Sequence, residues 1–145
     1  MKVVVQRVTT ATVRVNEEIV SEIGKGFLLL VGIHKDDDEN ILEKVAQKIL
    51  GLRIFTDSNG KMNENIFQAK GTILSVPQFT LLGDTSKGNR PGFDQSGKPE
   101  KAKELWKIFN NMLKLKNIIV KEGAFGEHMQ VSLTNDGPVT FIIEK

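Results

Sequence analysis

The chain has 145 residues, no cysteine and a formal net charge of +2. This length fits one domain with a sizeable core, and the lack of cysteine excludes disulfides, thiolate nucleophiles and sulfur-ligated metals. The small net charge permits contact with a nucleic acid but is too low for a dedicated polyanion binder. The longest apolar run, residues 27–31, is too short to cross a bilayer, and residues 1–7 lack the apolar stretch of a signal peptide. We therefore expect a single cytoplasmic domain over residues 1–145.

The first third of the chain is predicted to form strands. Residues 3–8, 11–15 and 19–23 are short and rich in β-branched side chains, and the second of these segments alternates apolar with polar side chains. Residues 16–18 stand where a hairpin turn is needed. Residues 26–33 are apolar throughout, which is typical of a strand buried on both faces.

Two segments change to the helical period. Residues 38–50 and 99–115 each carry an apolar stripe along one side, and Pro99 suits the first turn of the second helix. Three further strands are expected at residues 117–121, 127–134 and 139–144. Strand segments with two inserted helices and short hairpin links predict an α+β domain with antiparallel sheet, because a doubly wound parallel fold needs more helices.

The usual catalytic signatures are absent. There is no phosphate-binding loop, no nucleophile elbow and no His-Glu-x-x-His motif. His34 precedes the acidic residues 36–39, but acids in the first turn of a helix complement its dipole, so no metal is expected there. His128 is interpreted as a surface or hydrogen-bonded residue.

Three polar segments remain. Pro77 lies in a strand-like run, which suggests a strand end with open backbone groups. Residues 83–97 form a long polar loop, and loops of this length are often functional. Residues 135–140 resemble a turn before the last strand. Taken singly, each segment is equally compatible with a purely structural role.

Together these segments resemble the D-aminoacyl-tRNA deacylase family over essentially the whole chain. Residues 77–81, Pro-Gln-Phe-Thr-Leu, stand where the family has Ser-Gln-Phe-Thr-Leu. Residues 87–93 resemble the family's basic Arg-Pro-x-Phe loop, and residues 135–140 resemble its C-terminal Asn-Asp-Gly-Pro-Val-Thr motif. Residues 5–8 look like its opening strand, and residues 51–62 match it in spacing and type.

The resemblance implies a fold, a reaction and partners. The fold is an α+β, antiparallel β-barrel-like domain with two main helices, which works as a homodimer with active sites at the subunit interface. The reaction is hydrolysis of the ester of D-aminoacyl-tRNA, with mischarged glycyl-tRNA as a further substrate, and it serves proofreading in translation. Aminoacylated tRNA is the implied partner, without DNA, membrane, metal or other cofactor.

The resemblance also implies roles for single residues. Gln78 and Phe79 would direct backbone N–H groups at the developing oxyanion, and Thr80 lines the same site. Gly137 and Pro138 would form a cis pair that enters the neighbouring subunit's pocket and excludes L-aminoacyl groups by crowding. The other implied residues are Arg7 as support for that pair, Pro77, Phe125, Gly126 and Met129 as the substrate and adenosine pocket, and Lys87 and Arg90 as phosphate contacts.

Two alternatives exist for the chemistry at Thr80. A threonine nucleophile needs a base, and none is evident in these motifs. The favoured alternative is attack by water assisted by the 2′-hydroxyl of the terminal adenosine, since the aminoacyl ester is already activated. Pro77 departs from the family's serine, so that hydroxyl and that N–H are both missing.

Two rival functions remain open at this stage. One is an RNA-binding module without catalysis, which Pro77 favours. The other is a hydrolase of small esters or free D-aminoacyl compounds, which the basic loop and the adenosine pocket argue against because a small substrate would use neither.

Overall fold

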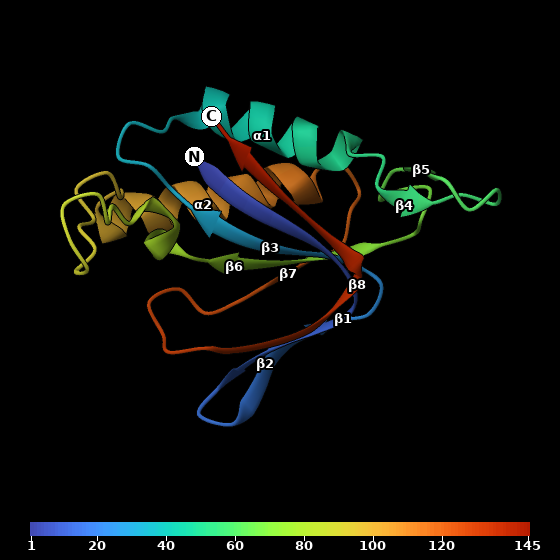
Figure 1. The fold of residues 1–145 in the computed structure, drawn as a ribbon, viewed down its shortest axis with the longest axis horizontal. Helices are drawn as coiled ribbons and strands as arrows, with labels where there is room; N and C mark the ends of the chain where they lie inside the picture. Colours follow the sequence, from blue (N-terminus) through green and yellow to red (C-terminus); the bar gives the residue numbers. More distant parts are fainter.

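The computed structural model describes residues 1–145, which form a curved six-stranded sheet with two helices packed on one of its faces and a separate two-stranded sheet (Figure 1). The six-stranded sheet follows the order β2-β1-β3-β6-β7, with β8 on the other side of β1, so the strands wrap into a nearly closed, barrel-like shape. The small sheet pairs β4 with β5. The elements are β1 (Lys2–Val15), β2 (Glu18–Ile23), β3 (Gly26–Gly32), α1 (Glu39–Gly51), β4 (Phe55–Thr56), β5 (Met62–Glu64), β6 (Thr72–Pro77), the 3-10 turn η1 (Phe79–Leu82), α2 (Pro99–Lys114), β7 (Val120–Glu122) and β8 (Gln130–Glu144). The predicted α+β class with two main helices is confirmed.

Both helices begin and end close to where the sequence placed them. The Asp38 side chain accepts a hydrogen bond from the N–H of Ile41 and caps α1, while Pro99 opens α2. Their apolar stripes pack on β1 and β3 in a core that includes Val5, Phe27 and Phe109. No helix is long and apolar enough to cross a membrane.

The six-stranded sheet is mixed: beside the expected antiparallel pairs it contains two parallel ones. β1 pairs antiparallel with β2, β3 and β8, whereas β3 pairs parallel with β6, and β6 pairs parallel with β7. Each parallel pair is joined by a crossover that contains one helix, α1 in the first case and α2 in the second. The apolar run of β3 is buried on both faces as predicted, and that burial is typical of parallel strands.

Candidate active site

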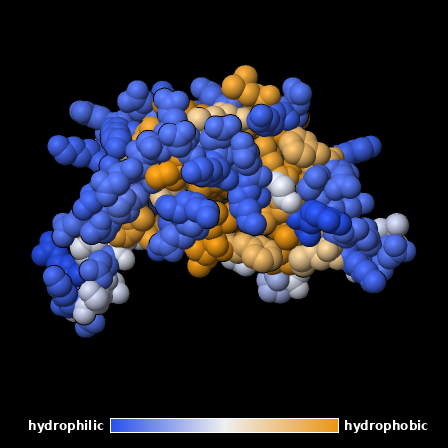
Figure 2. All heavy atoms as spheres, turned by 90° about the horizontal axis from the view of Figure 1, so that it is seen from above, coloured by the Kyte–Doolittle hydropathy of each residue, from blue (hydrophilic) through white to orange (hydrophobic).

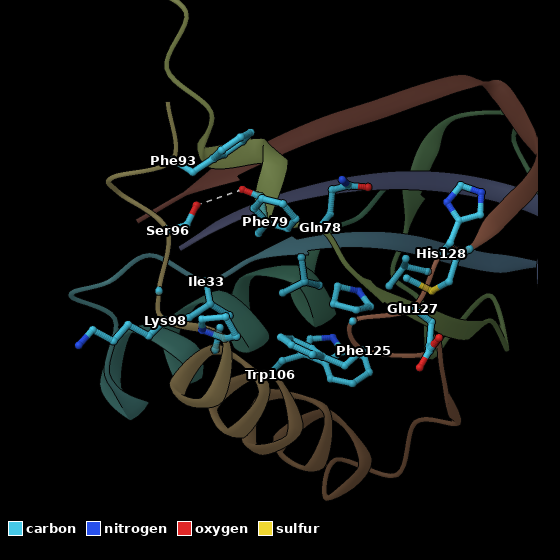
Figure 3. Close-up of a pocket in the computed structure, with 18 of the residues that line it drawn as sticks. Ile33, Gln78, Phe79, Phe93, Ser96, Lys98, Trp106, Phe125, Glu127 and His128 are labelled. Atoms are coloured by element: carbon cyan, nitrogen blue, oxygen red, sulfur yellow. Dashed lines mark hydrogen bonds between the residues drawn. The ribbon is translucent and has the colours of Figure 1, made fainter. Parts of the chain in front are cut away.

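A cavity of about 640 Å³ opens where the parallel strands β3 and β6 end. Val31 and Pro77, which are paired neighbours in these strands, form part of its wall. α2 contributes Trp106 and the segment after β7 contributes Phe125 (Figure 3). Met129 of the same segment also lines the cavity. Ligands of sheets with parallel strands bind beyond the carboxyl ends of those strands, so this cavity is the candidate site.

The floor of the cavity is an aromatic pair held by one buried serine. Trp106 and Phe125 lie with ring centroids 5.9 Å apart and planes inclined by 44°. The indole Nε1 of Trp106 donates a 2.9 Å hydrogen bond to the fully buried Oγ of Ser75. The carbonyl of Ser75 accepts a hydrogen bond of 2.8 Å from the N–H of Gly123. Ser75 therefore anchors both α2 and the segment that carries Phe125.

Replacing Ser75 with alanine is expected to lower the free energy of unfolding by about 1–3 kcal/mol, because the buried N–H of Trp106 then has no acceptor. Urea unfolding followed by the fluorescence of Trp106, the only tryptophan, measures this change. Ser58→Ala is the matched control, since Ser58 is exposed and its loss costs at most about 0.5 kcal/mol. Equal stability of the two variants would contradict a structural role for the buried hydrogen bond.

The segment that was expected to be reactive lies at the cavity rim. β6 ends at Pro77, as its proline predicted, and the chain continues directly into η1. Pro77, Gln78 and Phe79 all line the cavity, whereas Thr80, which was expected to line the same site, does not. One expectation is wrong: the N–H of Gln78 donates to the carbonyl of Val31 at 2.7 Å, so the sheet already uses this donor.

The open donors belong to the next two residues. The first hydrogen bond within η1 runs from the N–H of Leu81 to the carbonyl of Gln78. Phe79 and Thr80 precede it, and the first N–H groups of a helix have no partner inside it. Thr80 becomes a candidate backbone donor only once the turn is known, because the sequence of this segment is strand-like and does not reveal the start of η1.

Thr80 has no activating group beside it. Its side chain is exposed, and its Oγ1 accepts a hydrogen bond from the amide Nε2 of Gln78. No ionisable side chain hydrogen-bonds this hydroxyl. A threonine nucleophile would therefore lack the general base that such chemistry requires.

The predicted pocket residues Phe125, Gly126 and Met129 all line the cavity. The sulfur of Met129 accepts the N–H of Ala124 at 3.3 Å, which folds this segment around the methionine. Phe125 and Met129 also pack on the two apolar cores, so they are core and lining residues at once. His128 is exposed as predicted, yet it stands at the cavity mouth, on the same side as Gln78 (Figure 3).

The basic loop lies beside the cavity rather than in it. Asp84 and Gly92 exchange two backbone hydrogen bonds of 2.8 Å and close the loop into a narrow tip that carries Lys87 and Arg90, both exposed. The backbone N–H of Ser86 donates to the carboxylate of Asp84 and holds its pKa below the usual value. The loop returns to the cavity at Phe93.

Gly137 and Pro138 are joined by a cis peptide bond, as the resemblance implied. They are exposed and do not line the cavity of their own chain. The buried Arg7 supports them from β1: its guanidinium donates to the carbonyls of Asp136, at 3.1 Å, and of Ile54, and it pairs with the Asp136 carboxylate. Arg7 thus fixes the segment before the Gly–Pro pair.

No cluster of three or more His, Cys, Asp or Glu side chains is arranged to hold a metal ion. The imidazole of His34, near the acidic run, instead contacts Gln95 at 3.2 Å and Asp36 at 3.6 Å. These contacts tie the segment after β3 to the base of the basic loop.

Comparison with known proteins places the chain in a family. Residues 4–144 match the family model described as D-Tyr-tRNA(Tyr) deacylase. The chain belongs to this family. D-aminoacyl-tRNA deacylases of Staphylococcus haemolyticus and Lactobacillus gasseri are 55% and 50% identical to it, each over 99% of this chain and over 95% and 99% of their own lengths. The predicted membership of the deacylase family, and with it the hydrolase class, is confirmed.

Solved structures agree with this deacylase fold. One described as c-Myc DNA Unwinding Element Binding Protein is 42% identical, with a TM-score of 0.95 over 100% of this chain and 99% of that chain. Another, described as a probable eukaryotic D-amino acid tRNA deacylase, has a TM-score of 0.83 over 98% of this chain and 97% of that chain, at 21% identity. The second likeness concerns the fold alone.

Proposed function

We propose that this protein hydrolyses the ester bond between a D-amino acid and its tRNA in the cytoplasm, and that it also removes glycine from mischarged tRNA. Family membership supports the reaction class. The observation that carries the proposal is the start of η1: Phe79 lines a cavity with an aromatic floor, and the N–H groups of Phe79 and of the next residue, Thr80, precede the first hydrogen bond of the turn. Such a floor suits the unpaired terminal adenosine, because an unpaired base can stack on aromatic side chains.

The N–H groups of Phe79 and Thr80 then stabilise the oxyanion that forms when water attacks the ester carbonyl. Each donor of this kind typically contributes about 2.7–4 kcal/mol to lowering the barrier. With no base at Thr80, the vicinal 2′-hydroxyl of the substrate takes a proton from the attacking water and passes its own proton to the 3′ oxygen, which leaves as a hydroxyl when its bond to the carbonyl carbon breaks. Correct placement of the activated ester supplies much of the rate. Pro77 removes only a hydroxyl and an N–H that this route does not use.

A second copy of the chain completes the site in this proposal. Gly137 and Pro138 lie opposite Arg7 on β1, whereas the cavity lies beside Val31, which pairs with Val3. The offset of four residues along β1 corresponds to about 13 Å at the usual strand rise. The pair therefore acts in a partner's cavity, where its carbonyl oxygens crowd the place of an L side chain and leave room for a D side chain.

The surface of β8 favours such a homodimer. β8 pairs only with β1, so one edge of a 15-residue strand is without a sheet partner. Phe141 and Ile142 on this strand are 40% and 68% exposed. On the face drawn in Figure 2, apolar side chains are also visible between the hydrophilic ones. An unpaired strand edge can pair with another chain, and exposed apolar patches mark sites of protein–protein contact.

Deacylation of D-tyrosyl-tRNA beside L-tyrosyl-tRNA, with and without a chelator, tests the proposed reaction. We expect loss of the D form at least about a hundredfold faster than loss of the L form, without any effect of the chelator. Retention of both forms by folded protein would favour an RNA-binding module instead. Equally fast hydrolysis of a small D-aminoacyl ester would favour the small-ester hydrolase.

Phosphate contacts by Lys87 and Arg90 predict that the deacylation rate falls with added salt when the tRNA substrate is at low concentration.

A further inference from the structure

η1 carries the proposed oxyanion donors but has little internal support. It is four residues long and has no buried residue, and the side chain of Phe79 is 57% exposed. Its hydrogen bonds from Leu81 to Gln78 and from Gly83 to Thr80 measure 3.3 and 3.0 Å. Short 3-10 turns have poorer hydrogen-bond geometry than α-helices. The position of its first N–H groups therefore depends on what packs against the turn from outside.

Phe93 packs against both ends of this turn. Its ring meets the ring of Phe79 edge to face, with centroids 5.0 Å apart and planes at 64° (Figure 3). At the other end, a Cβ added to Gly83 would lie 3.1 Å from Cε1 of Phe93, so the ring rests directly on that glycine. Edge-to-face aromatic pairs stabilise a structure by more than the burial of their apolar area alone accounts for. A single side chain thus clamps η1 from the loop of residues 83–97.

The same loop makes a second contact with the turn and is itself anchored. Ser96 Oγ donates to the carbonyl of Phe79 at 3.3 Å. The base of the loop is joined to the segment after β3 by a 2.9 Å bond from the N–H of Gly97 to the carbonyl of Ile33. Asp84 and Gly92 close the tip immediately before Phe93. The clamp is therefore connected to fixed backbone on both sides.

We infer that Phe93 is a positioning residue of the reaction: it holds η1 so that the N–H groups of Phe79 and Thr80 point at the reacting carbonyl. This inference rests on the proposed function, because it assigns Phe93 an effect on the chemical step. It acts through Phe79 and Gly83 and not through contact with RNA phosphates. Small displacements of an oxyanion donor lower the rate of the chemical step, so loss of the clamp should be measurable as a lower kcat.

Kinetics on two substrates test the clamp. The variants are Phe93→Ala, Phe93→Leu and Gly83→Ala, and the substrates are D-tyrosyl-tRNA and D-tyrosyl-adenosine, which lacks the phosphates that Lys87 and Arg90 would contact. Gly83 has a φ of −67°, which alanine adopts freely, so its substitution acts through the Phe93 ring and the carbonyl of Thr80. Gly92→Ala is the matched control in the same loop, since its Cβ meets nothing closer than the Asp84 carbonyl at 4.0 Å.

We expect Phe93→Ala and Gly83→Ala to lower kcat by about tenfold on both substrates while KM stays within about twofold. Phe93→Leu should recover most of the rate because it restores apolar bulk against both contacts, and Gly92→Ala should keep the wild-type rate. A loss confined to D-tyrosyl-tRNA, with KM raised, would overturn the inference and make Phe93 part of the RNA-binding surface. An equal loss in Gly92→Ala would overturn it as well.

Amide hydrogen exchange separates failure of the clamp from failure of the proposed function. The N–H groups of Leu81 and Gly83 should exchange about tenfold faster in Phe93→Ala than in the wild type, whereas that of Gly97 should be unchanged. If the wild type hydrolyses neither substrate, the proposed function fails, and this exchange pattern still decides whether Phe93 holds the turn. Unchanged exchange at Leu81 and Gly83 would overturn the clamp whatever the kinetics show.

Discussion

Replacing Gly137 with alanine is expected to lower the rate of deacylation of D-tyrosyl-tRNA by about a hundredfold, since displacements near 1 Å can cost that much. A Cβ at this position would lie 2.7 Å from Cγ2 of Val139 and 3.1 Å from Nη2 of Arg7. The φ of +125° is also one that residues with a side chain rarely adopt. Both effects push the Gly137–Pro138 pair away from the position that Arg7 gives it. The initial rate on D- and L-tyrosyl-tRNA measures the result.

Gly60→Ala is the control for the general cost of losing a glycine. Gly60 has a φ of +76°, but a Cβ there meets nothing within 4 Å, and it lies in the turn between β4 and β5. It should retain the wild-type rate, with only a small loss of stability. A folded Gly137→Ala protein that deacylates D-tyrosyl-tRNA at the wild-type rate would contradict the role proposed for the Gly–Pro pair.

The strand pattern was predictable, but its continuity was not. The sequence predicts residues 3–8 and 11–15 as two short strands rich in β-branched residues, whereas both lie in the continuous β1. Between them lies an irregularity in the pairing with β8, between Val8 and Thr10, where the exposed Thr9 and Thr10 interrupt the buried series. A bulge and a chain reversal disturb the alternation in the same way, so the sequence does not separate them.

β8 shows the same effect on a larger scale. Residues 135–140 have the composition of a turn, yet the strand runs through them. Asn135 pairs with Val8 and Thr140 with Gln6, so four residues of β8 stand opposite the single residue Arg7. The extra backbone bends out of the sheet and presents Gly137 and Pro138. Only the partner strand reveals this excess, and a partner more than 120 residues away in the sequence leaves no local signal.

The site, too, was only partly predictable from the sequence. The resemblance to the deacylase family indicated Pro77, Gln78, Phe79, Phe125, Gly126 and Met129, and all of them line the cavity. Trp106 belongs to the apolar stripe of α2, as the periodicity predicts, but it also forms part of the cavity floor. Periodicity shows that a side chain is buried and gives no sign of a cavity on its other side. The proposed mechanism uses Thr80 in place of Gln78 as a donor because the N–H of Gln78 donates to Val31 next to the parallel pair, and such non-local pairing cannot be predicted from the local sequence.

That parallel pairing begins at Gly26, and Gly26→Ala is expected to cost more than about 4 kcal/mol of unfolding free energy. A Cβ there would lie 1.8 Å from the carbonyl oxygen of Thr72 and 2.7 Å from its N and C atoms, all of them backbone. Gly26 and Thr72 are the first paired residues of β3 and β6. No side-chain rotation relieves this contact, so the two strands must separate. With a total stability of roughly 5–15 kcal/mol for a typical domain, much of the protein should be unfolded or aggregated at ambient temperature.

Gly24→Ala, two residues earlier, provides the matched comparison because a Cβ at Gly24 meets nothing within 4 Å. Urea unfolding monitored by Trp106 fluorescence should place Gly24→Ala within about 0.5 kcal/mol of the wild type. A Gly26→Ala variant of similar stability would show that β3 and β6 do not approach this closely. The consequence reaches the active site, since the same pair of strands ends at the bond from Gln78 N–H to the carbonyl of Val31. Loss of the register at Gly26 would therefore shift η1 and its donors even in molecules that remain folded.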